Sequence, residues 1–143
     1  MLILSESLGT QLNLIARSIR LELEKQLASE EITPSQWMMM MALEENDHQV
    51  QSDLGKKLNL DNATITRIVD KLAERGFLER KQVKDDRRAQ IVSLTDKGKK
   101  KCKKYSKIGD YVNQRASIGI PETERKKLMS LLTKIQSNLE NSH

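Results

Sequence analysis

Residues 51–69 read QSDLGKKLNLDNATITRIV, and this stretch decides the fold of the chain. A helix-turn-helix needs two closely packed short helices, a small residue in the first helix, a turn residue that tolerates positive φ, and apolar positions between the helices. Gly55 is the small residue, and Asn59 takes the turn, where glycine is more usual but asparagine tolerates left-handed geometry. The apolar positions are Leu54, Leu58, Leu60, Ile65 and Ile68. The stretch predicts a helix-turn-helix, and a plain helical hairpin in a bundle is the alternative.

The second helix of the pair is predicted to begin after Asp61 and to end at Gly76. Asp61 can cap the free amides of the helix, and Gly76 can end it in the left-handed conformation. A helical projection turns four side chains inward: Ile65, Ile68, Val69 and Leu72. The outward and flanking residues near its start are those that would reach base edges in a major groove, namely Asn62, Ala63, Thr64, Thr66 and Arg67.

A β-hairpin is predicted after this helix, because the residue pattern changes. Residues 77–83 and 90–95 carry the β-branched and alternating residues of two strands, and the polar stretch 84–88 joins them. Arg87 and Arg88 lie at the tip, where an arginine can enter the narrow minor groove and its concentrated negative potential. An Asp-Arg-Arg sequence alone is usually a solvated turn, but its position after a candidate recognition helix predicts the wing of a winged helix-turn-helix.

The order of these parts resembles the MarR (multiple antibiotic resistance regulator) family of winged-helix transcription factors, over nearly the whole chain. The matching motifs are NATITRIVDKL at 62–72, RGFLER at 75–80, DRR at 86–88 and VSLTDKG at 92–98. The resemblance implies that Asp86 and Arg88 form an ion pair that stiffens the wing. It also implies that Arg87 reads the minor groove.

The resemblance further implies an obligate homodimer in which the first and the last two helices interlock and present two recognition helices to a pseudo-palindrome. It implies a small-molecule pocket between the dimer helices and the winged part, often for aromatic or amphipathic anions. Arg17, Trp37 and Met41 are the candidates to line such a pocket. The stronger alternative is that these positions belong to the ordinary core.

We expect one mainly α-helical domain over 1–143, with six helices and a small β-hairpin wing. Residues 33–95 form the winged helix-turn-helix, while 1–30 and 96–143 supply the dimerisation helices. The first helix carries two apolar faces, one read as the domain's own core and the other as a subunit interface. The first face holds Leu8, Leu12, Ile15, Ile19 and Leu23, and the second holds Leu14 and Leu21.

Capping residues and prolines predict where three further helices begin. Thr33 with Pro34 and Gln36 predicts a capped start for the second helix. Thr95 is expected to cap the helix after the hairpin, and Pro121 to open the last one. The last helix has one apolar face: Leu128, Leu131, Leu132, Ile135 and Leu139.

The stretch 97–107 contains seven lysines and no acid. It either contacts DNA phosphates or forms a solvated face, and contact is favoured for Lys97 and Lys99, which lie closest to the hairpin. Cys102 lies within this run, where nearby cations could make its thiol reactive. A buried or inert thiol is the stronger interpretation.

The composition narrows the class of protein. The chain has 143 residues, 37% hydrophobic and 31% charged, with a formal net charge of +5, which is typical of one soluble domain. A single cysteine excludes an intrachain disulfide and suits the cytoplasm. The longest apolar run, 37–43, is far shorter than the roughly 18 residues that a membrane span needs. A pI near 9.4 is compatible with a polyanionic partner.

No catalytic or metal-binding constellation can be assembled, because there are only two histidines and no nucleophile with a plausible base. We therefore predict a cytoplasmic transcription regulator and not an enzyme, with no cofactor and no membrane partner. It binds double-stranded DNA at a specific pseudo-palindromic operator as a dimer, and acts as a repressor released by a small aromatic or amphipathic effector. The alternative is a winged-helix module for protein interaction without specific DNA binding.

Overall fold

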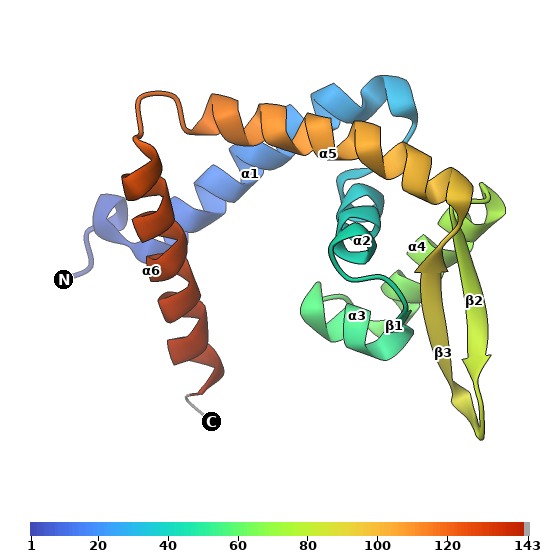
Figure 1. The fold of residues 1–143 in the computed structure, drawn as a ribbon. Helices are drawn as coiled ribbons and strands as arrows, with labels where there is room; N and C mark the ends of the chain where they lie inside the picture. Colours follow the sequence, from blue (N-terminus) through green and yellow to red (C-terminus); the bar gives the residue numbers. More distant parts are fainter. Residues whose placement is uncertain (142–143) are drawn as a thin grey trace. The chain divides into compact units, whose positions relative to one another are not determined.

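The computed structural model describes residues 1–141, except for the side chain of Arg87. The chain divides into two compact parts, Met1–Val112 and Asn113–His143. The elements are η1 (Leu4–Glu6), α1 (Leu8–Leu27), η2 (Ala28–Glu30), α2 (Pro34–Glu45), β1 (Gln49–Val50), α3 (Gln51–Lys57), α4 (Asn62–Glu74), β2 (Leu78–Val83), β3 (Asp86–Leu94), α5 (Asp96–Ala116) and α6 (Glu122–Glu140) (Figure 1). This is the predicted mainly α-helical fold with a small antiparallel sheet.

Aliphatic and methionine side chains fill the core of the first part. Met39, Met40 and Leu43 of α2 are completely buried, together with Leu54 of α3 and Leu72 of α4. Methionine suits such a core because its unbranched side chain adapts to irregular gaps, and aromatic residues make up only 3% of this chain. The methionine run on α2 is therefore mainly structural.

The helix-turn-helix is formed by α3 and α4, and its local geometry is the predicted one. A Cβ atom on Gly55 would lie 3.2 Å from the carbonyl oxygen of Leu60, so the turn passes close to the first helix. Asn59 has a φ of 54°, in the left-handed region. Asp61 caps α4 by accepting a hydrogen bond from the Thr64 amide at 2.7 Å, and Gly76 follows the helix with a φ of 77°. These contacts confirm the sequence prediction of a helix-turn-helix.

The sheet contains one strand more than the predicted hairpin, in the order β1-β3-β2. The two-residue strand β1 pairs Gln49 with Val92 and so fixes the start of α3 against the hairpin. The predicted boundaries of the hairpin were also wrong: β3 already begins at Asp86, and the turn consists of Lys84 and Asp85. Charged side chains do not prevent ladder pairing on a solvated wing, because each strand still satisfies the backbone groups of the other.

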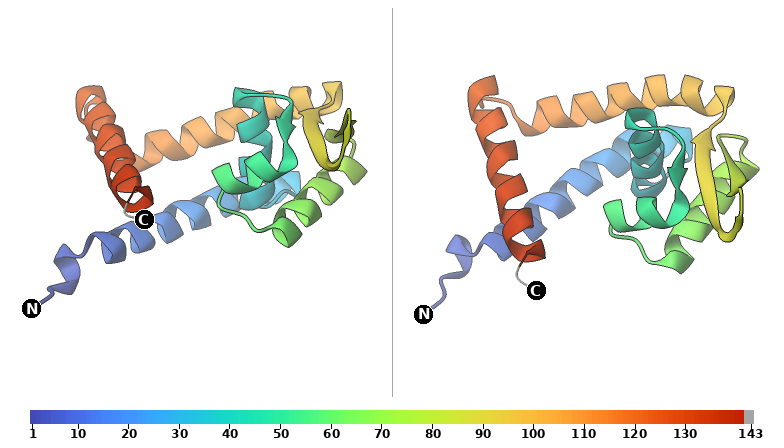
Figure 2. Two further views of the ribbon diagram at one scale, coloured as in Figure 1. Left: turned by 90° about the horizontal axis from the view of Figure 1, so that it is seen from below. Right: turned by 60° about the horizontal axis from the view of Figure 1, so that its bottom comes forward.

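Most of α1 lies outside the core, which corrects the prediction that one of its apolar faces packs inside the domain. Leu23 and Leu27 are buried, but the residues closer to the N-terminus are not. Exposed apolar side chains occur on both predicted faces: Leu8, Leu12, Leu14, Ile15, Ile19 and Leu21. Figure 2 shows the reason, since only the C-terminal end of α1 reaches the winged part and the rest projects beyond it.

The junction between the wing and α5 is tightly packed around Gly98. The Thr95 hydroxyl accepts a hydrogen bond from the Gly98 amide at 3.0 Å and donates one to the Gly76 carbonyl at 2.5 Å. The Thr95 amide in turn donates to the Phe77 carbonyl at 3.1 Å. A Cβ atom on Gly98 would overlap that same Phe77 carbonyl oxygen. The predicted cap at Thr95 is confirmed, and it holds α5 against the end of α4.

Arg75 ties the C-terminal end of α4 to the segment between α1 and α2. Its guanidinium donates to the carbonyl oxygens of Glu31 at 2.7 Å and Glu30 at 3.1 Å. The buried Glu30 carboxylate forms ion pairs with Lys101 and Lys104 of α5. The hydrogen bond from Lys104 is the main reason that the pKa of Glu30 is lowered. Three elements are thus joined at one point by charged groups.

The second part contains the end of α5, the turn at 117–121 and α6. Arg125 donates to the Ser117 hydroxyl at 3.3 Å and holds the start of α6 to the turn. The α6 helix has no buried residue in this structure. Its apolar face includes Leu128, Leu131 and Leu139, which are 46–66% exposed.

Candidate nucleic-acid interface

Burial of the inward side chains of α4 determines which of its residues face outward. Ile65, Ile68, Val69 and Leu72 are buried, as the helical projection predicts. Their burial leaves Asn62, Ala63, Thr66 and Arg67 exposed and Thr64 half-buried. The outer face is a shallow, open hollow lined by these residues: Asn62, Ala63, Thr66, Arg67, Asp70, Lys71 and Glu74. The burial matches the predicted faces of the helix, whereas contact of the outward residues with DNA stays a prediction.

A second hollow, of about 250 Å³, lies where the wing meets the starts of α3 and α4. Arg88 and Gln90 line it from β3, and Asn62 and Thr66 line it from α4. Gln51 of α3 lies in the same hollow. The structure therefore brings one predicted wing residue, Arg88, beside two predicted recognition residues.

Within the wing, Asp86 contacts the backbone of Arg88. The Asp86 Oδ1 atom accepts a hydrogen bond from the Arg88 amide at 2.9 Å. The ion pair between these side chains that the resemblance implies is not among the ion pairs of the described side chains. A short aspartate side chain reaches an amide two residues along more easily than a distant guanidinium. The predicted role of Arg87 falls on a side chain outside the described part of the structure.

Asp61 sets the charge at the start of α4. The hydrogen bond from the Thr64 amide is the main reason that the pKa of Asp61 is lowered. Asp61 thus stays ionised at neutral pH and places a negative charge at the end of the helix that would face DNA. Attraction for phosphate on this surface must come from its cations, Arg67, Lys71 and Arg88.

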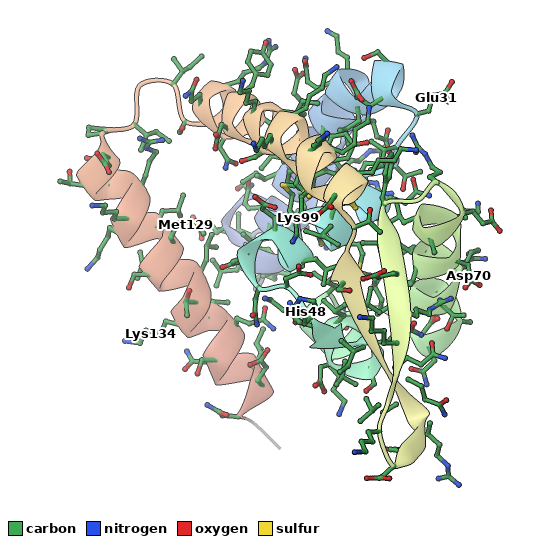
Figure 3. All side chains as sticks on the ribbon, turned by 45° about the vertical axis from the view of Figure 1, so that its right-hand side comes forward. Glu31, His48, Asp70, Lys99, Met129 and Lys134 are labelled. Carbon is green, nitrogen blue, oxygen red and sulfur yellow. The ribbon has the colours of Figure 1, made fainter. Side chains whose placement is uncertain are left out.

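Arg80 of β2 organises this surface, and sequence analysis missed it. Its guanidinium forms an ion pair with Asp70 of α4 and donates to the Thr66 carbonyl at 3.1 Å. Its Nε atom also donates to the Gln51 side chain at 3.1 Å. Figure 3 shows Asp70 on the outer side of α4, away from the core. A signal was present, because strand period 2 places Arg80 on the same face as the buried Leu78.

The predicted phosphate contacts lie at the other end of α4. Lys97 donates to the Arg75 carbonyl at 2.9 Å and lies over the Phe77 ring, 5.3 Å from its centre. Lys97 therefore caps the C-terminal end of α4, away from Asn62 at its start. Lys99 is exposed near the start of α5, at the base of the wing (Figure 3).

The candidate effector residues are spread over α1 and α2. Arg17 is exposed, whereas Trp37 and Met41 are half-buried and pack against the core. The Trp37 indole donates to the Tyr105 carbonyl of α5 at 2.9 Å. Neither of the two hollows described above is lined by these three residues.

Cys102 has the buried environment that was the stronger interpretation of its sequence context. Its side chain has no exposed surface. Burial raises the pKa of the Cys102 thiol to about 12, so the thiol stays protonated at neutral pH. The neighbouring lysines do not activate it.

Neither a metal site nor a membrane span is found within residues 1–141. No three histidine, cysteine, aspartate or glutamate side chains in this part of the chain come together as metal ligands. No helix there has both the length and the apolar character needed to cross a bilayer.

Comparison with known proteins places this geometry among transcriptional regulators. A family model described as "MarR family" matches residues 32–89, which span α2 to the start of β3. The uncharacterized HTH-type transcriptional regulator YdgJ of Bacillus subtilis (strain 168) is 29% identical over 110 residues, covering 77% of this chain and 67% of that protein.

Solved structures of transcriptional regulators resemble this chain in fold. A mutant MarR from E. coli in complex with operator DNA has a TM-score of 0.79 at 25% identity, covering 90% of this chain and 92% of that chain. CouR from Rhodococcus jostii RHA1 bound to p-coumaroyl-CoA has a TM-score of 0.85 at 21% identity, covering 94% and 95%. At 21% identity, the similarity to CouR shows a shared fold alone.

Proposed function

We propose that this chain, whose residues 32–89 match the MarR family model, is a winged helix-turn-helix transcriptional regulator of that family, and that it binds a specific pseudo-palindromic operator as a homodimer and represses transcription there. This is a family of regulators and not of enzymes. The observation that carries the proposal is the continuous surface formed by the N-terminal half of α4 and the start of β3. Arg67 and Arg88 contribute its cations, and Asn62 and Thr66 its hydrogen-bonding groups.

The surface suits the two grooves of duplex DNA. A major groove about 12 Å wide admits one α-helix, so α4 can enter it with Asn62, Ala63, Thr64, Thr66 and Arg67 toward the bases. The wing then lies over the adjacent backbone, where we assign the minor-groove contact to Arg87. Asp86 supports this contact by holding the Arg88 amide and so ordering the start of β3.

Lys97 and Lys99 have a smaller part in this proposal. Lys97 is engaged at the C-terminal end of α4, so Lys99 and the rest of the lysine run supply only long-range attraction for phosphate.

Release by a small molecule completes the proposed function. CouR in the comparison above is bound to p-coumaroyl-CoA, an aromatic acyl thioester that carries negative charge. We assign the effector region of this chain to the neighbourhood of Arg17, Trp37 and Met41, beside α5. Trp37 is the only tryptophan in the chain, so its fluorescence reports directly on binding there.

Fluorescence anisotropy with the DNA upstream of the protein's own gene tests the function. We expect this DNA to bind at least about 10³-fold more tightly than a random duplex of equal length and salt concentration. Adding p-coumaroyl-CoA or simple aromatic carboxylates should change Trp37 fluorescence and release the DNA. Equal affinity for both duplexes would instead favour a winged-helix module for protein interaction.

The proposed homodimer rests on apolar side chains of α1 and α6 that are exposed in the described part of the chain. Ile15 and Ile19 of α1 are 50% and 40% exposed, and Leu131 of α6 is 46% exposed. A soluble protein rarely leaves such contiguous apolar stripes in water, and a second copy with the same stripes covers them by symmetry. The dimerisation helices are then α1, α5 and α6.

Ile15→Asp is expected to convert the dimer into a monomer, because a carboxylate would be buried without a partner in the subunit interface. Asn13→Asp is the matched control, since it puts the same group on the polar side of α1. Sedimentation at micromolar concentration measures both variants and the unmodified protein, with circular dichroism as a check on folding. A stable monomer in the unmodified protein would refute the dimer.

A further inference from the structure

The hydroxyl of Thr66 ends a chain of polar contacts that starts at Asp70. The Asp70 carboxylate pairs with Arg80, and the Arg80 Nε atom donates to Gln51 Oε1 at 3.1 Å. Gln51 Nε2 then donates to Thr66 Oγ1 at 3.2 Å. These contacts form a closed ring, because Arg80 also donates to the Thr66 carbonyl at 3.1 Å.

Because arginine can only donate hydrogen bonds, it determines which atom donates and which accepts at each step of this series of contacts. A guanidinium has donors only, so the end of the Gln51 amide that faces Arg80 must be the oxygen. The NH₂ end of Gln51 therefore faces Thr66, and the Thr66 oxygen must accept. Only one arrangement of the Gln51 amide satisfies both neighbours, and it leaves the hydroxyl hydrogen of Thr66 available.

This hydrogen has no acceptor among the hydrogen bonds of the described residues. The usual acceptor for a threonine hydroxyl in a helix is a carbonyl one turn earlier. Thr133 of α6 shows that usual bond, donating to the Met129 carbonyl at 3.0 Å. Thr66 is exposed and lines both hollows of the interface, so its free donor can meet a ligand there.

We propose that Arg80 and Gln51 are positioning residues that make Thr66 a hydrogen-bond donor toward the N7 atom of one purine in each operator half-site. The proposal rests on the proposed function and deepens it by naming the base atom that Thr66 reads. N7 is an acceptor in the major groove on both adenine and guanine. Thr66 thus separates purine from pyrimidine at one position, whereas the neighbouring Arg67 supplies the contact that prefers guanine.

The test replaces each operator purine in turn by its 7-deaza analogue, which lacks the N7 acceptor. At one position per half-site we expect binding to weaken about five- to tenfold, the effect of one hydrogen bond. Thr66→Val should abolish this penalty because valine has no donor. Anisotropy at fixed salt measures the ratio of the two affinities for each variant, so a uniform change in affinity cancels.

Gln51→Glu separates positioning from structural support. A carboxylate still pairs with Arg80 but can only accept, so Thr66 would donate to it and turn its lone pairs outward. We expect the 7-deaza penalty to disappear in Gln51→Glu although Thr66 is still present. Arg80→Lys, which keeps the charge but loses the planar fork, should reduce the penalty in the same way. Ser52→Ala, in the same hollow but outside the chain of contacts, is the matched control and should keep it.

The outcomes are distinct. A full 7-deaza penalty in Gln51→Glu would overturn the positioning role, and a penalty unaffected by Thr66→Val would overturn the assignment of N7 to Thr66. Specific binding of the unmodified operator in either case leaves the proposed function intact. Loss of all preference for the operator over random DNA in the unmodified protein would refute both proposals together.

Discussion

Gly98→Ala is expected to lower the free energy of unfolding by about 3 kcal/mol, because overpacking against rigid backbone is among the more costly single substitutions. The added methyl group would overlap the carbonyl oxygen of Phe77, and backbone cannot rotate away as a side chain can. That carbonyl also accepts the hydrogen bond from the Thr95 amide, so a displacement loses this contact as well. Urea unfolding at a fixed protein concentration measures the change.

Gly9→Ala is the matched control for this prediction. Gly9 lies near the start of α1, as Gly98 lies near the start of α5, but apart from its chain neighbours and the backbone of its own helix no described atom lies within 4 Å of the position of its Cβ. Alanine should stabilise there by up to about 1 kcal/mol through helix propensity. Similar small effects at both positions would show that the junction between the wing and α5 relaxes without cost.

Arg67→Ala is expected to weaken operator binding by about 1–3 kcal/mol, which corresponds to a factor of roughly 5 to 150. The side chain is exposed in the N-terminal half of α4, where an arginine can pair bidentately with guanine. Its loss should therefore relax base preference as well as affinity. Competition assays with operators substituted at single positions measure both quantities.

Lys71→Ala on the same outer face is the comparison for Arg67. Lys71 lies in the C-terminal half of α4, so we expect it to contact phosphate only. Its removal should weaken specific and random DNA equally and lower the salt dependence of binding by about one phosphate contact. If Arg67→Ala behaved in this way too, Arg67 would be a phosphate contact, and the assignment of α4 as the recognition helix would survive.

The sequence predicted the helix-turn-helix well because short-range physics determines it. The left-handed Asn59, the cap at Asp61 and the buried Ile65 and Ile68 each follow from residue type and spacing. The strand β1 could not be predicted, since two residues carry no periodicity. Its pairing with β3 depends on the folded hairpin.

The polar contacts of the site were harder to predict than its helices. Arg80, Asp70 and Gln51 lie on three different elements, and only the tertiary fold brings their side chains together. The hydrogen bond from the Lys97 ammonium group to the Arg75 carbonyl could not be predicted either, because it depends on how α5 packs against the end of α4, and contact of Lys97 with phosphate stays a prediction. One apolar face of α1 was wrongly assigned to the domain's own core, because periodicity shows an apolar face but not what covers it.

The hydrogen bonds of Arg75 hold α4 at its C-terminal end, so a small rotation of the helix about that end moves its N-terminal end the most. The helix has 13 residues and is therefore about 20 Å long. Arg75 at its C-terminal end donates hydrogen bonds to the Glu30 and Glu31 carbonyls, and the Glu30 carboxylate forms an ion pair with Lys101 of α5. These elements are therefore directly linked. A rotation of about 5° at this fulcrum would swing the far tip by about 2 Å, given that length. Strain applied to α5 would thus displace the N-terminal tip of α4, which we propose reads the bases, without any contact to that tip.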